Sequence, residues 1–410
     1  MTGKSTVTFA KSYALLLAGV ILVITGASAL LTPTGRRPSL MLVISDDLRY
    51  DYMFASNASS NASSSSGSST NSSYNLRNIQ RLMSTGVTFE NAFANFASCG
   101  PSRQSMLTGR VPDALGVWNQ LDHFRQKGSA ARSLPEHLIS EGYKTISIGK
   151  VLHYDTNYGV DEMLSWSETH FGAPSSTDRK CPKGSYFCTC TEPDCADFRI
   201  AARAVSLIPS LAEAHFEGTP FFMAIGFRRP HLDWRVPASW TTRAGAAAQF
   251  PISDPVRSFP SGVPDIAYFA CDKLNHRGEV KTSGGHSETR LVPASLTARM
   301  RTAYWTSVAY MDEQLGRVMT ALRRNNMEME TIVIFTSDHG YSLGERAFWC
   351  KQSLQDVAVR IPFIVSVPWM PNLQGTRSRD TVDLLDLYPT VVSLLNMRQP
   401  DKCLQGVSVI

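Results

Sequence analysis

A cysteine at the predicted start of a helix is the residue around which the chemistry of this chain is organised. In Cys99-Gly-Pro-Ser-Arg103 the thiol lies four positions before an arginine, and the run that follows, to Arg110, has a helical character. The free N–H groups and positive dipole end of a helix start favour negative charge. A nucleophile placed there is suited to attack an anionic ester. Taken alone, however, a cysteine in a secreted protein is more often half of a disulfide.

Acidic residues follow two runs that read as buried strands, Ser39–Ser45 and Thr331–Thr336. The polar residues after these runs are Asp46, Asp47, Asp338 and His339. Carboxylate oxygens are hard ligands, so this set suits Ca²⁺, or alternatively Mg²⁺, better than a soft-site metal. The competing interpretation of Asp46 and Asp47 is a helix cap or turn, and that pair alone does not decide between the two.

Basic residues and histidines follow two further predicted strands, at 143–148 and 220–226. These residues are Lys150, His153 and His231, and Lys351 comes later in the chain. Because the carboxyl ends of parallel strands meet at one edge of a sheet, we expect all of these groups to converge around Cys99. Arg103, Lys150 and Lys351 are then candidates to bind an anionic group and to balance charge in a transition state. His153 and His231 are candidate general acid–base residues.

Strands that alternate with helices predict an α/β fold with a large, mostly parallel sheet covered by helices on both faces. The amphipathic stripe in 295–324 predicts the longest helix. Other helices are expected at 75–86, 134–141, 198–215 and 381–395, and other strands at 87–89 and 362–367. Residues 232–293 lack periodicity and are expected to form long loops over the active face.

The amino-terminal residues 1–38 have the pattern of a secretory signal peptide or an uncleaved membrane anchor, with an apolar run from Tyr13 to Leu31. We therefore expect a lysosomal or extracellular protein, whose only membrane contact is a possible anchor. Residues 56–73 are a Ser/Asn-rich insert with three glycosylation acceptors, expected to be flexible. The net charge of +5 comes without a Lys/Arg run, which argues against nucleic-acid binding.

The eight cysteines fit an oxidising compartment. Four are clustered, at 181, 188, 190 and 195, and their spacing favours a disulfide-stapled loop over a zinc site because it lacks paired CxxC motifs and a nearby histidine. The pairing itself cannot be read from the sequence.

The motifs together resemble those of the sulfatase family. Cys99–Arg103 with Leu107-Thr-Gly-Arg110 looks like the sulfatase signature, and the motifs ending at Asp47, His153, His231 and Gly340 follow in the expected order. The resemblance covers about Ser39 to Ser408, so 39–410 is interpreted as one catalytic domain. Within the family the chain is most similar to the enzymes that act on 2-sulfated iduronate.

The resemblance implies an alkaline-phosphatase-like fold and a specific chemistry. A formylglycine-generating enzyme would oxidise Cys99, and the hydrated aldehyde would attack the sulfur of a sulfated saccharide. Asp46, Asp47, Cys99, Asp338 and His339 would surround the metal. Arg103 and Lys150 would hold the hydrate and the sulfate, His153 would assist breakdown of the intermediate, and His231 and Lys351 would help the leaving oxygen depart.

Two departures from the family pattern raise questions. Cys350, directly before Lys351, is not expected there and is either a free thiol or a disulfide partner. The family also implies a smaller carboxyl-terminal antiparallel domain, which we expect to be missing from this chain because it ends at Ile410. The alternatives are therefore an aryl- or choline-type sulfatase, a phosphate or phosphonate ester hydrolase of the same superfamily, or a truncated, inactive glycan-binding remnant.

Overall fold

The computed structural model describes residues 30–57, 76–153, 155–172, 181–182, 185–244, 258–269, 271–275, 278–283, 285, 287, 290–400 and 404–410. Most of the predicted leader and of the Ser/Asn-rich insert lies outside these residues. None of the helices formed by the described residues is both long and apolar enough to cross a membrane.

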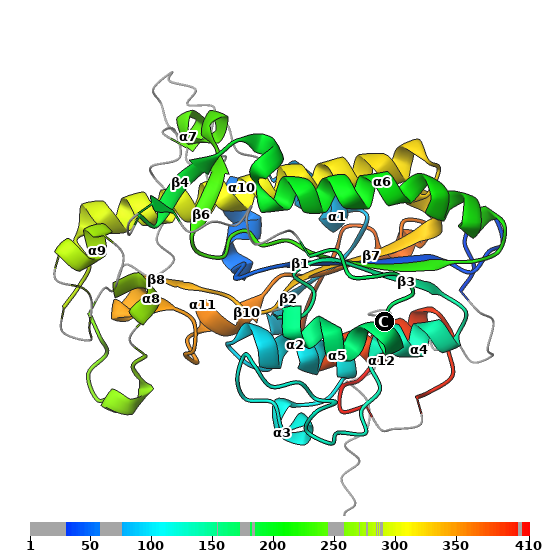
Figure 1. The fold of residues 1–410 in the computed structure, drawn as a ribbon, viewed down its shortest axis with the longest axis horizontal. Coiled ribbons are helices and arrows are strands. Elements are labelled where there is room, and N and C mark those ends of the chain that lie inside the picture. Colours follow the sequence, from blue (N-terminus) through cyan, green and yellow to red (C-terminus); the bar gives the residue numbers. More distant parts are fainter. Residues whose placement is uncertain are drawn as a thin grey trace, which may run out of the picture.

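One mixed sheet of eight strands forms the centre of the molecule (Figure 1). Its strand order is β10-β2-β11-β7-β1-β5-β3, and β12 pairs with β2 along nearly the whole length of that strand. Six of the eight strands run in one direction, and β10 and β11 run against them. The sheet strands are β1 (Ser39–Ser45), β2 (Gly86–Phe93), β3 (Lys144–Gly149), β5 (Phe221–Gly226), β7 (Thr331–Ser337), β10 (Arg360–Ile361), β11 (Phe363–Ser366) and β12 (Thr376–Asp383). Two small ribbons lie outside it, β4 (Phe187–Cys190) with β6 (Trp234–Pro237) and β8 (Ser342–Leu343) with β9 (Trp349–Cys350).

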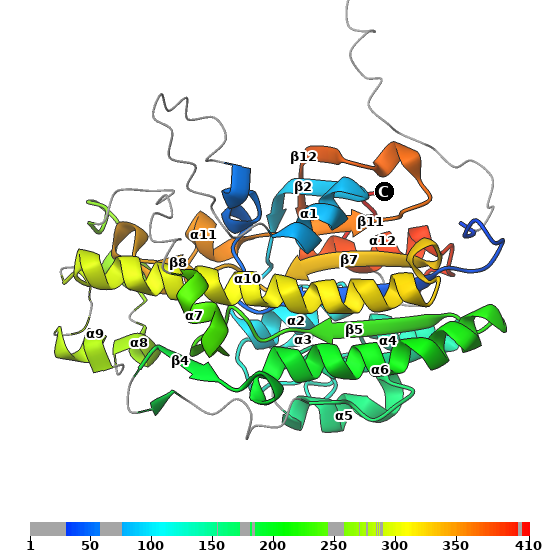
Figure 2. The same cartoon turned by 90° about the horizontal axis from the view of Figure 1, so that it is seen from above.

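Helices cover both faces of this sheet, as the α/β prediction requires (Figures 1 and 2). On one face lie α1 (Arg77–Ser84), α6 (Ala196–Phe216) and α10 (Ala294–Arg324), and on the other α2 (Cys99–Thr108), α4 (Leu134–Ser140), α5 (Asp155–Ser165) and α12 (Leu387–Leu394). The shorter helices are α3 (Pro112–Leu115), α7 (Ala238–Ala244), α8 (Asp272–Asn275), α9 (Gly278–Thr282) and α11 (Asp356–Val359).

Strand β1 contributes side chains to two hydrophobic cores, one on each face of the sheet. Met41 and Val43 pack into the core under α6 and α10, whereas Leu40, Leu42 and Ile44 pack into the core on the opposite face. Alternate side chains of a strand point to opposite faces, so a strand that is apolar throughout must be covered twice. This double burial makes β1 a rigid central strand, which fixes where the residues after Ser45 are placed.

Two predictions about secondary structure were wrong. Residues 381–395 do not form one helix, because Thr381–Asp383 complete the edge strand β12 and only Leu387–Leu394 are helical. Strand β12 is largely exposed and has no apolar alternation, so its sequence carries no strand signal. The region 232–293 was predicted as loops, but its described part contains β6, three short α-helices and one short 3-10 helix.

A buried histidine connects the amino-terminal ends of two central strands, β1 and β7. His215 Nδ1 lies 2.9 Å from Ser39 Oγ, and its Nε2 lies 3.1 Å from Glu330 Oε2. Thr34 also donates to that carboxylate at 3.0 Å. Because β1 and β7 carry the acidic motifs at their other ends, this contact helps to hold the site's framework in register.

We expect His215→Ala to lower the free energy of unfolding by about 1–3 kcal/mol, because it leaves a buried carboxylate without its main partner. Chemical unfolding measures this directly. The control is Glu328→Ala, which removes the partly exposed pair with Arg81 and should cost no more than about 1 kcal/mol. Equal losses in the two variants would contradict the assigned role of His215.

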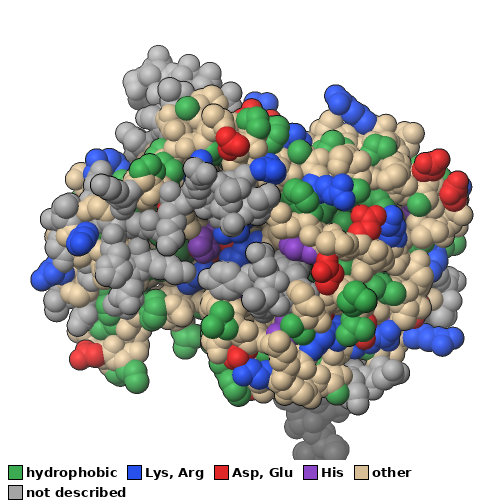
Figure 3. Space-filling view, viewed as in Figure 1, with side chains coloured by type: hydrophobic (Ala, Val, Ile, Leu, Met, Phe, Trp, Pro, Cys, Tyr) green, Lys and Arg blue, Asp and Glu red, His purple; other side chains and the backbone are tan. Residues whose placement is uncertain are grey.

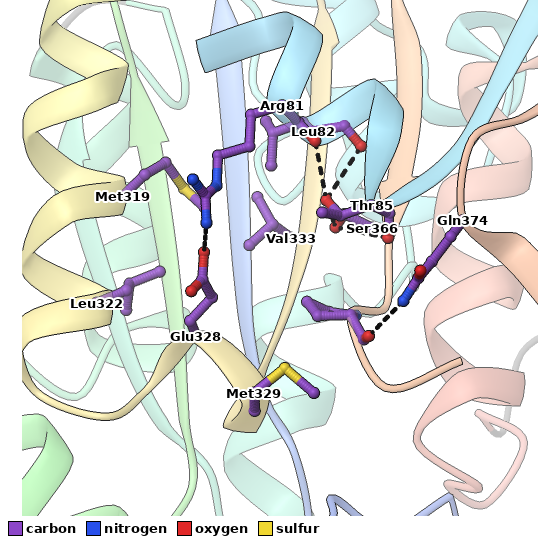
Figure 4. Close-up of a pocket in the computed structure, with 11 residues that line it drawn as sticks. Arg81, Leu82, Thr85, Met319, Leu322, Glu328, Met329, Val333, Ser366 and Gln374 are labelled. Carbon is purple, nitrogen blue, oxygen red and sulfur yellow. Dashed lines mark hydrogen bonds and ion pairs between the residues drawn. The ribbon is translucent and has the colours of Figure 1, made fainter. Parts of the chain in front are cut away.

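The Arg81–Glu328 pair lies at a cavity of about 340 Å³ between α1, α10 and the end of β11 (Figure 4). Apolar side chains such as Met319, Leu322 and Met329 line most of it. The cavity lies beside Val333 in the first half of β7, away from the strand end that carries Asp338. It is therefore separate from the candidate active site.

Candidate active site

Four neighbouring strands in the order β7-β1-β5-β3 run parallel and end at the same edge of the sheet. Each continues directly into one of the polar motifs named above. The pairings that bring these ends level are Ser45 with Ser337, and Gly149 with Gly226. Figure 3 shows histidine side chains beside Lys or Arg side chains near the middle of one face of the molecule.

Cys99 is the first residue of α2 and is fully buried where these strand ends meet. Its Sγ lies 2.9 Å from Lys351 Nζ and 3.4 Å from Lys150 Nζ. It also lies 3.3 Å from His339 Nε2 and 3.5 Å from Asp46 Oδ1. Four side chains from separate parts of the chain therefore contact the sulfur of one residue.

The electrostatic surroundings favour the thiolate form of Cys99. Burial acts to raise the pKa of the thiol, but the ammonium groups of Lys150 and Lys351 outweigh it and the pKa is lowered. Among the cysteines that the structure describes, Cys99 alone is outside a disulfide. The reading of Cys99 as half of a disulfide is therefore excluded.

The other described cysteines form three disulfides, Cys181–Cys188, Cys190–Cys195 and Cys271–Cys350. The first two confirm the prediction of a locally stapled loop in place of a zinc site. The third shows that Cys350 is a disulfide partner and not a free thiol. Its bond connects the residue before Lys351 to a segment 79 positions earlier.

Arg103 lies one helical turn after Cys99 and joins two of the three acidic residues. Its Nε donates to Asp338 Oδ2 at 2.8 Å, and its Nη2 donates to Asp46 Oδ1 at 3.3 Å. Its Nη1 donates to the carbonyl oxygens of Lys150 and Val151. The guanidinium is fully buried, so these contacts replace its hydration and orient both carboxylates.

Each of the two lysines donates to one oxygen of a neighbouring carboxylate. Lys150 Nζ donates to Asp46 Oδ2 at 2.5 Å, and Lys351 Nζ donates to Asp47 Oδ1 at 2.7 Å. Burial acts to raise the pKa of Asp46, but the surrounding positive groups, Lys150 foremost, together outweigh it and hold the pKa well below its usual range. For Asp47 burial prevails over Lys351 and raises the pKa to about 6.

The residues present fit a divalent cation. Asp47 Oδ2 is buried and has no hydrogen-bond partner among the described residues. Buried polar atoms almost always have a partner, and a bound cation would supply one here. Ligand atoms of Asp46, Cys99, Asp338 and His339 all lie within 4.8 Å of one another. His339 Nδ1 lies 2.9 Å from the carbonyl of Gly340 and donates to it, which turns Nε2 toward Cys99. Metal-binding histidines are commonly oriented by a second contact of this kind.

The histidines after β3 and β5 lie beside the same cluster, with His153 buried and His231 partly buried. Burial, reinforced by Lys150, lowers the pKa of His153 to about 2. Burial also holds the pKa of His231 well below its usual range. Ligand atoms of His231, Asp47 and Cys99 lie within 4.8 Å of one another. Both imidazoles are therefore neutral at physiological pH in the substrate-free site.

The structure thus brings all ten predicted site residues to one place, and it adds three that sequence reasoning missed. Gln120 Oε1 accepts the N–H of Gly100 at 2.7 Å. Ser102 donates to the carbonyl of Asp338, and the Tyr304 hydroxyl donates to the carbonyl of Asp47 at 2.7 Å. The contact of Gln120 explains the glycine at position 100, because a Cβ there would lie 2.9 Å from Gln120 Oε1.

The match to a family model described as Sulfatase extends over residues 38–397. Iduronate 2-sulfatase of Homo sapiens is 30% identical over 375 residues, which are 80% of this chain and 66% of that protein. A sulfatase of Formosa agariphila is 28% identical over 349 residues, 78% of this chain and 64% of that protein. The chain therefore spans slightly less than two-thirds of the length of these relatives.

The phosphonate monoester hydrolase of Agrobacterium radiobacter has the same fold. Its structure superposes with a TM-score of 0.68 at 18% identity, covering 91% of this chain and 76% of that one. The fold, the extent of the family match and the relatives agree with the motifs from which the site was built. By these findings the chain belongs to the sulfatase family.

Proposed function

We propose that this chain is a sulfuric ester hydrolase that cleaves sulfate monoesters at residue 99. The observation that supports this most strongly is the setting of Cys99, whose sulfur lies within 3.5 Å of two lysines, a histidine and a carboxylate. An anionic ester of a tetrahedral oxyacid needs a nucleophile surrounded by cations, and this edge of the sheet supplies both.

The nucleophile in this proposal is formylglycine, made from Cys99 by a formylglycine-generating enzyme of the secretory pathway. One hydroxyl of the hydrated aldehyde attacks sulfur, the bond from sulfur to the ester oxygen breaks, and the alcohol leaves with a proton. The second hydroxyl then loses its proton, the bond from carbon to the sulfate oxygen breaks, and the aldehyde is restored as sulfate leaves.

Asp46, Asp47, Asp338 and His339, together with residue 99, are the residues we propose to hold Ca²⁺, with Mg²⁺ as the alternative. A cation bound there polarises the sulfate oxygens and neutralises developing charge. Arg103 keeps two of these carboxylates oriented. Lys150 and Lys351 hold the hydrate and the sulfate, because both ammonium groups already contact the position of the nucleophile.

His231 and His153 are the proposed proton carriers. Both are neutral in the substrate-free site because burial lowers their pKa values. A bound sulfate places negative charge beside them, and a nearby negative charge raises the pKa of an imidazole. His231 can then take up the proton that the attacking hydroxyl loses and deliver it to the leaving oxygen, and His153 accepts one from the second hydroxyl during release of sulfate.

The substrate we propose is a 2-sulfated iduronate residue, or a related sulfated sugar, of a glycosaminoglycan. The support is the 30% identity to a protein named iduronate 2-sulfatase, together with the motifs after β3 and β7. An oxidising compartment is supported by the three disulfides. We therefore propose a lysosomal or extracellular location.

Two measurements on protein from a secretory host test the proposal. Mass spectrometry of the peptide spanning Cys99 should show formylglycine, and a disaccharide ending in 2-sulfated iduronate should release sulfate. If formylglycine is present but only an aryl sulfate is turned over, the proposed sulfuric ester hydrolase activity stands and the proposed sugar substrate is wrong. Turnover of a phosphonate monoester alone would favour the other branch of the superfamily. An unmodified cysteine without any turnover would indicate the inactive glycan-binding alternative.

A further inference from the structure

Lys351 lies between two residues whose backbone is left-handed. Cys350 has φ 65° and Gln352 has φ 63°, and neither is a glycine. Such conformations are unfavourable for residues with a side chain and persist only where the surroundings hold them. On one side of Lys351 the restraint is a hydrogen bond, because the N–H of Gln352 donates to the carbonyl of Ala97 at 3.0 Å. This ties the segment after Lys351 to the stretch that leads into Cys99.

On the other side of Lys351 the restraint is covalent. Cys350 is bonded to Cys271, a buried residue whose carbonyl accepts the N–H groups of Leu274 and Asn275. The Tyr341 hydroxyl also donates to Cys350 Sγ at 3.0 Å. The backbone before Lys351 is therefore fixed to a turn of helix that is 79 positions earlier in the chain.

Aromatic packing supports the same junction. The Phe348 ring lies 5.5 Å from the rings of both Phe259 and Tyr268, measured between centroids. These two residues belong to the described stretch shortly before Cys271. The segment that carries Lys351 thus packs against the same region that contains Cys271, the disulfide partner of Cys350.

The ammonium of Lys351 depends on this backbone for its position. It is carried by four flexible methylene groups, yet it reaches both Asp47 Oδ1 at 2.7 Å and Cys99 Sγ at 2.9 Å. A flexible side chain can hold a donor in place only if its own backbone does not move. Donors that are fixed before the reaction contribute most to catalysis.

We propose that the Cys271–Cys350 disulfide is a positioning element for catalysis, which holds Lys351 against the nucleophile at residue 99. The inference rests on the proposed function, in which Lys351 holds the hydrate and the sulfate. Both cysteines act through Lys351 and contact neither substrate nor reacting atoms.

The test compares two paired substitutions, each removing one disulfide without leaving a lone thiol. Cys271→Ser with Cys350→Ser removes the tether, and Cys190→Ser with Cys195→Ser is the matched control. We expect the tether variant to lose about 10- to 100-fold in kcat, the range for displacement of a catalytic group by about 1 Å. KM should change less than kcat, and formylglycine content should equal that of the wild type. The control should retain kcat within about twofold, because Cys190 and Cys195 contact no site residue in any described interaction.

A second background separates positioning from general stability. In a chain that already carries Lys351→Ala, removal of the tether should have no further effect on kcat, because the group it positions is gone. A merely structural disulfide would lower kcat by the same factor in both backgrounds. That result would overturn the proposal.

A third readout needs no turnover and therefore separates this inference from the proposed function. Acetylation of Lys351 by acetic anhydride, followed by mass spectrometry, should be slow in the wild type because the side chain is only 12% exposed. It should rise several-fold in the tether variant. If that variant does not fold, the folded wild type is reduced with a phosphine and its free thiols are alkylated. Mass spectrometry then identifies the molecules in which the Cys271–Cys350 bond was reduced, and acetylation of Lys351 is measured in those molecules. An unchanged acetylation rate overturns the proposal even if the wild type releases no sulfate.

Discussion

Replacement of Cys99 by alanine is expected to abolish sulfate release, with a loss in kcat/KM of about 10⁴-fold or more, as for other covalent nucleophiles. The side chain is the only part of the proposed machinery that forms a bond to sulfur, so the surrounding cations cannot substitute for it. Sulfate release is measured with an aryl sulfate and with a 2-sulfated disaccharide, at matched protein concentration.

The fold should survive this change. The polar groups that lie 2.9–3.5 Å from the sulfur of Cys99 all have other partners. Lys150 and Lys351 keep their carboxylate partners at 2.5 and 2.7 Å when the sulfur is removed. We therefore expect the free energy of unfolding to fall by no more than about 1–2 kcal/mol, a typical value for a single substitution.

Cys99→Ser is the control for the chemistry. Serine is similar in size to cysteine and places a hydroxyl at the start of α2. It lacks the thiol that the proposal requires as the precursor of the aldehyde. We expect this variant to be as inactive as Cys99→Ala when the protein comes from the same secretory host. Retained turnover by Cys99→Ser would show that a simple hydroxyl nucleophile suffices, and would contradict the formylglycine route.

Much of the site was predictable because its residues follow buried strands. A run such as Ser39–Ser45, apolar at almost every position, can lie only in the middle of a covered sheet, and parallel strands place their carboxyl ends together. The sequence therefore predicts that Asp46 and Asp338 meet, although 292 positions separate them. The structure places Asp338 Oδ1 3.1 Å from the N–H of Asp47.

Features held by single contacts between distant loops were not predictable. Gln120 reaches Gly100 from a loop without periodicity, and no spacing rule connects them. The partner of Cys350 is Cys271, which is 79 positions away within a region that was predicted to form long loops over the active face. Strand β12 was missed because an exposed edge strand needs no apolar pattern, so its register is decided by its neighbour β2 alone.

Asp338→Ala is expected to abolish metal-dependent activity and also to destabilise the chain. The substitution removes one proposed metal ligand and leaves the fully buried guanidinium of Arg103 without its 2.8 Å partner. Breaking a buried ion pair by removing one member costs about 3–5 kcal/mol. Asp46 remains 3.3 Å from Arg103 Nη2 and limits the loss, so we expect about 3 kcal/mol in chemical unfolding.

Asp338→Asn separates the two effects. An amide oxygen can still accept the N–H groups of Asp47 and His339, both of which lie 3.1 Å from Asp338 Oδ1. Part of the lost stability should therefore return, whereas the charge that attracts a divalent cation does not. We expect Asp338→Asn to unfold later than Asp338→Ala and to require far more Ca²⁺ for turnover, or to show none. Chelator-treated wild type should lose activity and regain it on addition of Ca²⁺ or Mg²⁺. If both variants kept wild-type activity after chelation, the carboxylates at this strand edge would be structural, and the proposed metal site would be wrong.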